Sequence, residues 1–129
     1  MVVLLPIHVL VVDDEPSICH SLSEFLDDFG FQVSSAENAE KAIELLEKHP
    51  YDAAVIDLRL PGMSGETLML LAYKKQPQLK FVIHTGSAGY LISNELKAIG
   101  ISQENVFFKP QPDLTRIANA ILSLLKRTP

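Results

Sequence analysis

Short apolar runs alternate with segments of helical periodicity along the sequence. The runs span residues 9–12, 31–33, 53–56, 81–83 and 106–108. Most of them are continuously apolar rather than alternating, which is typical of parallel strands covered on both faces. Five such βα units predict an α/β fold, with a doubly wound parallel sheet, right-handed crossovers and helices on both faces. For five strands the common order is 2-1-3-4-5.

The segments between the runs carry apolar residues three and four positions apart, and we expect a helix in each. Pro16, Asn38 and Gly30 are suited to a first helical turn, an N-cap and a C-cap respectively. The last two helices are expected to bury the stripes Leu91, Ile92, Leu96, Ile99 and Leu114, Ile117, Ala118, Ile121, Leu125. Tyr90, Leu122 and Leu124 fall beside these stripes, so we expect them on the surface.

Length and composition restrict the class of protein. A chain of 129 residues fits one domain, residues 1–129, with a single core. The net charge of −5 and the scattered basic residues argue against direct binding of nucleic acid. The single cysteine, Cys19, cannot form an internal disulfide, which suits a reducing cytosol.

The apolar N-terminus, residues 1–12, is predicted to be a strand with a short lead-in. It is interrupted by Pro6 and His8 and ends at Asp13. A membrane-spanning helix needs roughly 20 apolar residues, so no membrane anchor is expected here. We therefore expect a cytoplasmic protein.

Acidic residues follow two of the predicted strands. Asp13 and Asp14 end the first strand, and Asp57 ends the third. In the predicted order these strands are neighbours, so the carboxylates converge where doubly wound sheets bind ligands. Their mutual repulsion would be relieved by a hard divalent cation such as Mg²⁺, which prefers oxygen ligands. Alternatively, Asp13 and Asp14 are turn or N-cap residues ahead of Pro16.

A hydroxyl and an ammonium follow the remaining two strands of this edge. Thr85 ends the fourth strand and Lys109 the fifth. Taken singly, Thr85 is explained as a helix-start residue and Lys109 as a solvated surface residue. Together with the acids they suit a phosphoryl group on Asp57, which would add roughly −1.5 to −2 charge and need a cation, an ammonium and a hydroxyl donor.

Four motifs in this order resemble the signature of the receiver domain of two-component response regulators. They are residues 11–15 (VVDDE), 57–65 (DLRLPGMSG), 85–86 (TG) and 109–110 (KP). The resemblance covers residues 7 to about 127 and implies a flavodoxin-like (βα)5 fold.

The resemblance also implies a role for each site residue. Asp57 would be the phosphoacceptor, with Mg²⁺ bound by Asp14 directly, by Asp13 largely through water, and by the carbonyl of Arg59. Thr85 would move to meet the phosphoryl group, and Lys109 would pair with its oxygens, next to a Lys109–Pro110 bond that is allowed to be cis.

By this resemblance the chain is a signalling switch phosphorylated by a histidine kinase or a phosphotransfer protein. It would not be an enzyme beyond its own phosphorylation and dephosphorylation. The surface of the last two helices and the last strand, residues 91–99, 106–108 and 114–125, is expected to mate with a second copy or a partner. One departure is Val106, which occupies a position where many receivers carry an aromatic switch residue.

Three other functions compete with this one. A haloacid-dehalogenase-type phosphohydrolase would carry its nucleophile after the first strand in a DxD arrangement, and an FMN binder would need a phosphate-binding loop there. A degenerate receiver that binds partners without phosphorylation is the third. Both a complete single-domain regulator and the receiver part of a longer protein are consistent with the sequence.

Overall fold

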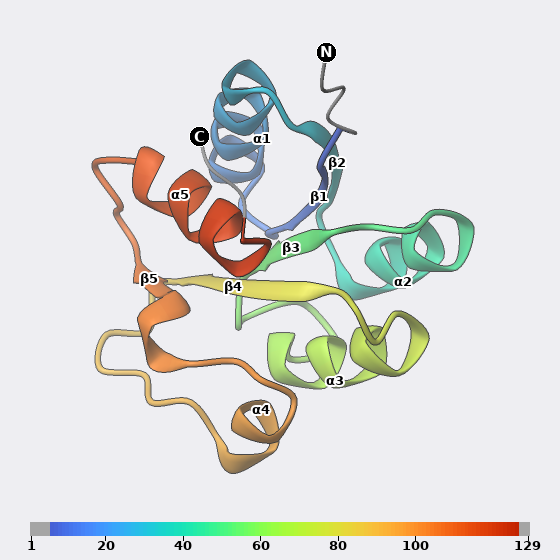
Figure 1. Cartoon of the computed structure of the whole chain (residues 1–129). Helices are drawn as coiled ribbons and strands as arrows, with labels where there is room; N and C mark the ends of the chain where they lie inside the picture. The colour runs from blue at the N-terminus through green and yellow to red at the C-terminus, as the bar shows by residue number, and fades with distance from the viewer. Residues whose placement is uncertain (1–5, 127–129) are drawn as a thin grey trace.

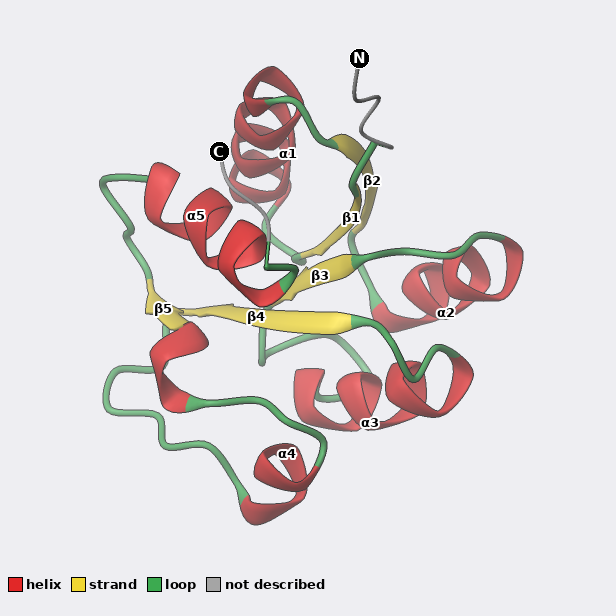
Figure 2. Cartoon of the chain, viewed as in Figure 1, coloured by secondary structure: helices red, strands yellow, loops and turns green. Residues whose placement is uncertain are grey.

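The computed structural model describes residues 6–126, which form a five-stranded parallel sheet of order β2-β1-β3-β4-β5 between two layers of helices (Figure 1; Figure 2). The strands are β1 (His8–Val12), β2 (Gln32–Ala36), β3 (Ala53–Ile56), β4 (Lys80–Thr85) and β5 (Val106–Phe108). The helices are α1 (Pro16–Phe29), α2 (Ala39–Lys48), α3 (Gly65–Lys75), α4 (Asn94–Ala98), α5 (Thr115–Leu124) and a short 3-10 helix, η1 (Gln103–Asn105). The predicted fold class and strand order are confirmed.

The core has two halves, one on each face of the sheet. In β1, Val9 and Val11 pack with α1 and α5, whereas Leu10 and Val12 pack with α2, α3 and α4. Figure 1 shows the same division, with α1 and α5 on one face and the other three helices opposite. Because both faces are covered, β3 is apolar at every position and β1 at every position after His8, which explains why their sequences do not alternate.

Local sequence signals set several helix boundaries. The Asn38 side chain accepts a hydrogen bond of 2.8 Å from the amide of Lys41, so it caps α2 as predicted. Pro16 occupies the start of α1, and Gly30 ends that helix with a positive φ of 121°. Pro16 and Asn38 therefore mark where α1 and α2 begin after the chain leaves the sheet edge that holds the acidic residues.

Two expectations for the last helices are wrong. Leu91 precedes α4, which begins only at Asn94, and its side chain is 77% exposed rather than part of the core. Leu122 is 6% exposed and packs in the core of the α1–α5 face. Residues 117, 118, 121 and 122 form two adjacent pairs one turn apart, so the buried stripe of α5 is wider than the periodicity suggested.

The remaining residues of these stripes follow the prediction more closely. The buried ones are Ile92, Leu96, Ile117, Ala118 and Ile121, and the half-buried ones are Ile99, Leu114 and Leu125. Tyr90 and Leu124, expected on the surface, are half-buried. The first strand begins at His8, and residues 1–5 of the predicted lead-in lie outside the described part of the chain. Within residues 6–126, no helix combines the length and the apolar character needed to cross a membrane.

Candidate metal centre at the carboxyl ends of the strands

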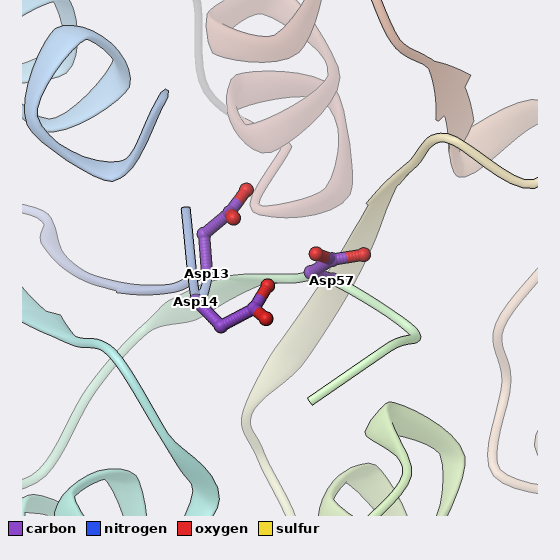
Figure 3. A group of neighbouring side chains, drawn as sticks. All are labelled: Asp13, Asp14 and Asp57. Carbon is purple, nitrogen blue, oxygen red and sulfur yellow. The ribbon is translucent and has the colours of Figure 1, made fainter. Parts of the chain in front are cut away.

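Three carboxylates meet at the carboxyl edge of the sheet. Asp13 and Asp14 follow β1 and Asp57 follows β3, and these strands pair so that Val12 lies beside Ile56. One oxygen from each of the three side chains lies within 4.8 Å of the others (Figure 3). The predicted convergence of the acids is therefore confirmed.

The donor set fits a hard divalent cation. Asp13 and Asp57 are buried, whereas Asp14 is exposed and leaves the cluster open to solvent on its side. Mg²⁺ prefers oxygen ligands and retains several waters, so a cluster of carboxylates with one open side suits it. The backbone holds the cluster in place, since the Asp57 amide donates to the Val12 carbonyl at 2.9 Å.

Lys109 reaches the same cluster from the end of β5. Its Nζ lies 2.9 Å from Asp13 Oδ2, 3.2 Å from Asp57 Oδ2 and 3.0 Å from Glu15 Oε1. Burial opposes the ammonium charge, but the hydrogen bonds to Asp13 and Glu15 and the charge of Asp57 outweigh it and raise the pKa of Lys109. The ammonium therefore stays charged at neutral pH, and three carboxylates surround it within 3.2 Å.

Thr85 and Arg59 complete the predicted residues. Thr85 is fully buried at the end of β4, and its hydroxyl accepts a 3.1 Å hydrogen bond from the Ser87 amide. The Arg59 amide donates to Asp57 Oδ1 at 3.3 Å, which orients the carboxylate. The metal contact expected of the Arg59 carbonyl stays a prediction, as do the other roles that the resemblance implies.

The start of α3 presses directly against the backbone of Asp57. The Gly65 amide donates to the Leu58 carbonyl at 2.8 Å. A Cβ placed on Gly65 would lie 2.2 Å from the Asp57 carbonyl oxygen and 2.8 Å from the Leu58 Cα. Glycine is required here because of this close approach, and the Ser64 hydroxyl caps the helix by accepting from the Thr67 amide.

Comparisons with known proteins agree with this geometry. The family model described as the response regulator receiver domain matches residues 9–122. The chain belongs to this family. Membership in it sets aside both the phosphohydrolase and the FMN-binder alternatives.

Among curated relatives, the receiver domain is 30% identical over 117 residues to the response regulator protein PilR of Pseudomonas aeruginosa, covering 91% of this chain and 26% of PilR. It is 27% identical over 110 residues to the response regulator GtcR of Aneurinibacillus migulanus, covering 85% of this chain and 44% of GtcR. The chain thus spans less than half the length of either relative.

Solved structures share the fold. The response regulator TrrA of Thermotoga maritima, in complex with Mg²⁺ and BeF, superposes with a TM-score of 0.78 at 26% identity, covering 92% of this chain and 98% of TrrA. A CheY-like receiver domain from Methanospirillum hungatei gives a TM-score of 0.75 at 25% identity, covering 95% and 98% of the two chains.

Two residues near the site of this receiver domain were given no chemical role by sequence reasoning. Glu15 contacts Lys109, which lies 94 positions later in the sequence. The only sequence signal for this contact is that Glu15 directly follows Asp13 and Asp14. His84 is buried, and neither ring nitrogen has a hydrogen-bond partner among the described residues. Burial, reinforced by the charge of Lys109, lowers the pKa of His84 to about 4, so its ring is neutral at pH 7.

The Lys109–Pro110 peptide bond is cis, as the resemblance allowed. Val106, at the position where many receivers have an aromatic residue, is a buried strand residue in the core beside α4.

Proposed function

We propose that this receiver domain is a phosphoacceptor switch that takes a phosphoryl group on Asp57 in a Mg²⁺-dependent reaction. The observation that carries the proposal is the meeting of three carboxylates with the Lys109 ammonium at one sheet edge. The complex of TrrA with Mg²⁺ and BeF supports it, since TrrA covers nearly the same length and has the same fold.

The phosphoryl donor would be a phosphohistidine of a histidine kinase or a phosphotransfer protein. An Asp57 carboxylate oxygen attacks phosphorus, the P–N bond breaks, and the imidazole leaves and takes up a proton from solvent, while an acyl phosphate forms on Asp57. Asp13, Asp14 and Asp57 would hold Mg²⁺, with the Arg59 carbonyl as a further ligand. When bound, Mg²⁺ supplies positive charge beside the phosphoryl oxygens.

The chain's own residues then rearrange around the new group. Lys109 already contacts the Asp57 carboxylate, so a short shift of its ammonium brings it onto a phosphoryl oxygen. The Thr85 hydroxyl donates to another phosphoryl oxygen, and its movement carries the segment after β4 with it. Attack of water on the acyl phosphate resets the domain, so the chain catalyses only its own modification and its reversal.

The first test is labelling with acetyl phosphate, followed by intact-mass spectrometry. We expect one added phosphoryl group in the presence of Mg²⁺ and none after chelation with EDTA, because the carboxylates repel the donor without a cation. Absence of labelling under both conditions would favour a degenerate receiver. Labelling that EDTA does not reduce would contradict the metal dependence.

Replacing Lys109 tests the ammonium separately from the metal. We expect Lys109→Ala to lower the labelling rate about tenfold or more, since hydrogen bonds to charged groups contribute roughly 1.5–3 kcal/mol. Mg²⁺ binding should persist, because the ammonium competes with the cation for Asp13 and Asp57. Lys109→Arg should rescue only part of the rate, as the guanidinium has a different shape.

Lys80→Ala is the matched control, since Lys80 is exposed at the opposite end of β4. It should label at the normal rate. Loss of Mg²⁺ binding in Lys109→Ala, measured by calorimetry, would show that Lys109 does not have the role proposed here.

For the output, we propose that the surface of α4, β5 and α5 mates with a second copy or a partner protein. Leu91 and Phe108, on the loop before α4 and at the end of β5, are the exposed large apolar side chains among the described residues. Because Leu122 is buried, Leu91 and Phe108 are the residues to mutate on this surface. The acidic net charge supports protein rather than nucleic acid as the partner. We also propose that this interaction takes place in the cytoplasm.

A further inference from the structure

The segment between Thr85 and α4, residues 86–93, is tied to α3 by one side-chain hydrogen bond. The Tyr90 hydroxyl donates to the carboxylate of Glu66, in the first turn of α3. Tyr90 is half-buried, and burial together with Glu66 raises the pKa of its phenol, so it remains a proton donor at neutral pH. The bond thus joins two segments that are 24 positions apart in sequence.

The α3 end of this bond is part of the Asp57 site. Glu66 directly follows Gly65, whose amide is hydrogen-bonded to the Leu58 carbonyl. Since Leu58 is the residue after Asp57, the Glu66 carboxylate is carried by backbone that is fixed to the phosphoacceptor segment. A second bond at Ser64, the cap of α3, keeps this first turn helical.

The other end of the bond leads to Thr85 in a few steps. The Tyr90 amide donates to the Ser87 carbonyl at 3.2 Å, and the Ser87 amide donates to the Thr85 hydroxyl at 3.1 Å. In the described residues, Thr85 has no hydrogen bond to Asp57. When Thr85 turns toward a phosphoryl group on Asp57, its hydroxyl leaves the Ser87 amide, so the turn that leads to Tyr90 loses this hydrogen bond.

Gln103 holds the backbone on either side of Leu91, at Tyr90 and Ile92. Its amide group donates to the Tyr90 carbonyl at 2.9 Å, and its carbonyl oxygen accepts from the Ile92 amide at 3.0 Å. Gln103 lies in η1, directly before β5. The backbone around Tyr90 is thus fixed by η1, while its side chain is fixed by α3.

We propose that the Tyr90–Glu66 hydrogen bond is a latch that positions Thr85 in the unphosphorylated state and opens when Thr85 turns toward Asp57. The inference rests on the proposed function, because it assumes that Thr85 approaches a phosphoryl group there. Tyr90 and Glu66 are positioning residues and touch neither the phosphoryl donor nor the cation. Their bond stabilises one of two arrangements, so removing it shifts the population toward the other.

The test is a titration with beryllofluoride in the presence of Mg²⁺. Beryllofluoride, as a phosphoryl mimic, binds the arrangement in which Thr85 has turned, so its apparent affinity is proportional to the population of that arrangement. We expect Tyr90→Phe, which removes only the hydroxyl, to bind it about fivefold more tightly than the natural chain. Glu66→Ala should have the same effect, and the double variant should show no further gain.

Tyr73→Phe is the matched control, since it removes a tyrosine hydroxyl from α3 outside the latch. It should bind beryllofluoride with unchanged affinity. A purely structural role of Tyr90 would instead lower the unfolding temperature without tightening binding. Unchanged or weaker affinity in Tyr90→Phe would therefore overturn the latch.

A second measurement follows the latch directly. The chain has three tyrosines, so incorporation of 3-fluorotyrosine gives three ¹⁹F signals, and Tyr90 is assigned by its absence in Tyr90→Phe. We expect the Tyr90 signal to shift with beryllofluoride while that of buried Tyr51 stays in place. A Tyr90 signal that does not move would also overturn the latch. No beryllofluoride binding by the natural chain would instead overturn the proposed function, and the latch with it.

Discussion

Replacing Asp57 with asparagine is expected to abolish phosphorylation by acetyl phosphate. An amide oxygen is a poor nucleophile, and Asp57 is a buried carboxylate at the sheet edge in contact with Lys109. The near-isosteric side chain can still accept the Arg59 amide, so the fold should be retained. Mg²⁺ binding should weaken as well, because one charge of the three-carboxylate cluster is lost. Intact-mass spectrometry and a metal titration measure the two effects.

Asp52→Asn is the matched control for this result. Asp52 directly precedes β3, whereas Asp57 directly follows it. Asp52 therefore lies at the opposite edge of the sheet, where its side chain accepts a hydrogen bond from the His8 amide. This variant should be labelled at the normal rate. If Asp57→Asn were labelled as well as the natural chain, another residue would be the acceptor and the proposed chemistry would be wrong.

The parts of the site that sequence predicted are those set by strand ends. Asp13, Asp57, Thr85 and Lys109 each end or directly follow a strand, and parallel strands bring their carboxyl ends to one edge. Once the alternation of strands and helices is recognised, this convergence follows from topology without knowledge of side-chain positions. The strand order was predictable for the same reason, as only a few connections are allowed.

The parts that sequence did not predict depend on packing between distant segments. The contact between Glu15 and Lys109 joins residues 94 positions apart, and the bond between Tyr90 and Glu66 joins the loop after β4 to α3. Helical periodicity predicts which face of a helix is apolar, but it does not predict how much of the helix surface the neighbouring elements bury. Leu122 was therefore assigned to the surface, although α5 lies close enough to the sheet to bury it.

The start of α4 was missed for a related reason. Leu91 and Ile92 fit an apolar stripe, but the helix begins after the Ser93 side chain, which accepts from the Leu96 amide at 3.3 Å. Residues 86–93 therefore form a longer loop than expected, held by side chains rather than by helical hydrogen bonds. This loop is the segment that the proposed latch controls.

Replacing Gly65 with alanine should destabilise the domain strongly and is the sharpest test of the packing beneath the site. Alanine favours a helix over glycine by about 1 kcal/mol. Against this, the new Cβ would lie 2.2 Å from the Asp57 carbonyl oxygen, a backbone atom that cannot rotate away. Overpacking costs typically 1–3 kcal/mol, occasionally more. A contact this short with a backbone atom belongs at or above the upper end of that range, so the clash wins and we expect a net loss of about 2 kcal/mol. Thermal unfolding measures it.

The clash also bears on function, because α3 can relieve it only by moving away from Asp57 and Leu58. That movement would break the 2.8 Å hydrogen bond from the Gly65 amide and displace Asp57 relative to Asp13 and Lys109. Labelling should therefore slow even in molecules that remain folded. Gly86→Ala is the control, since a Cβ there meets nothing within 4 Å and stability should change by less than about 0.5 kcal/mol. A Gly65→Ala variant as stable as Gly86→Ala would mean that α3 is not pressed against the phosphoacceptor segment.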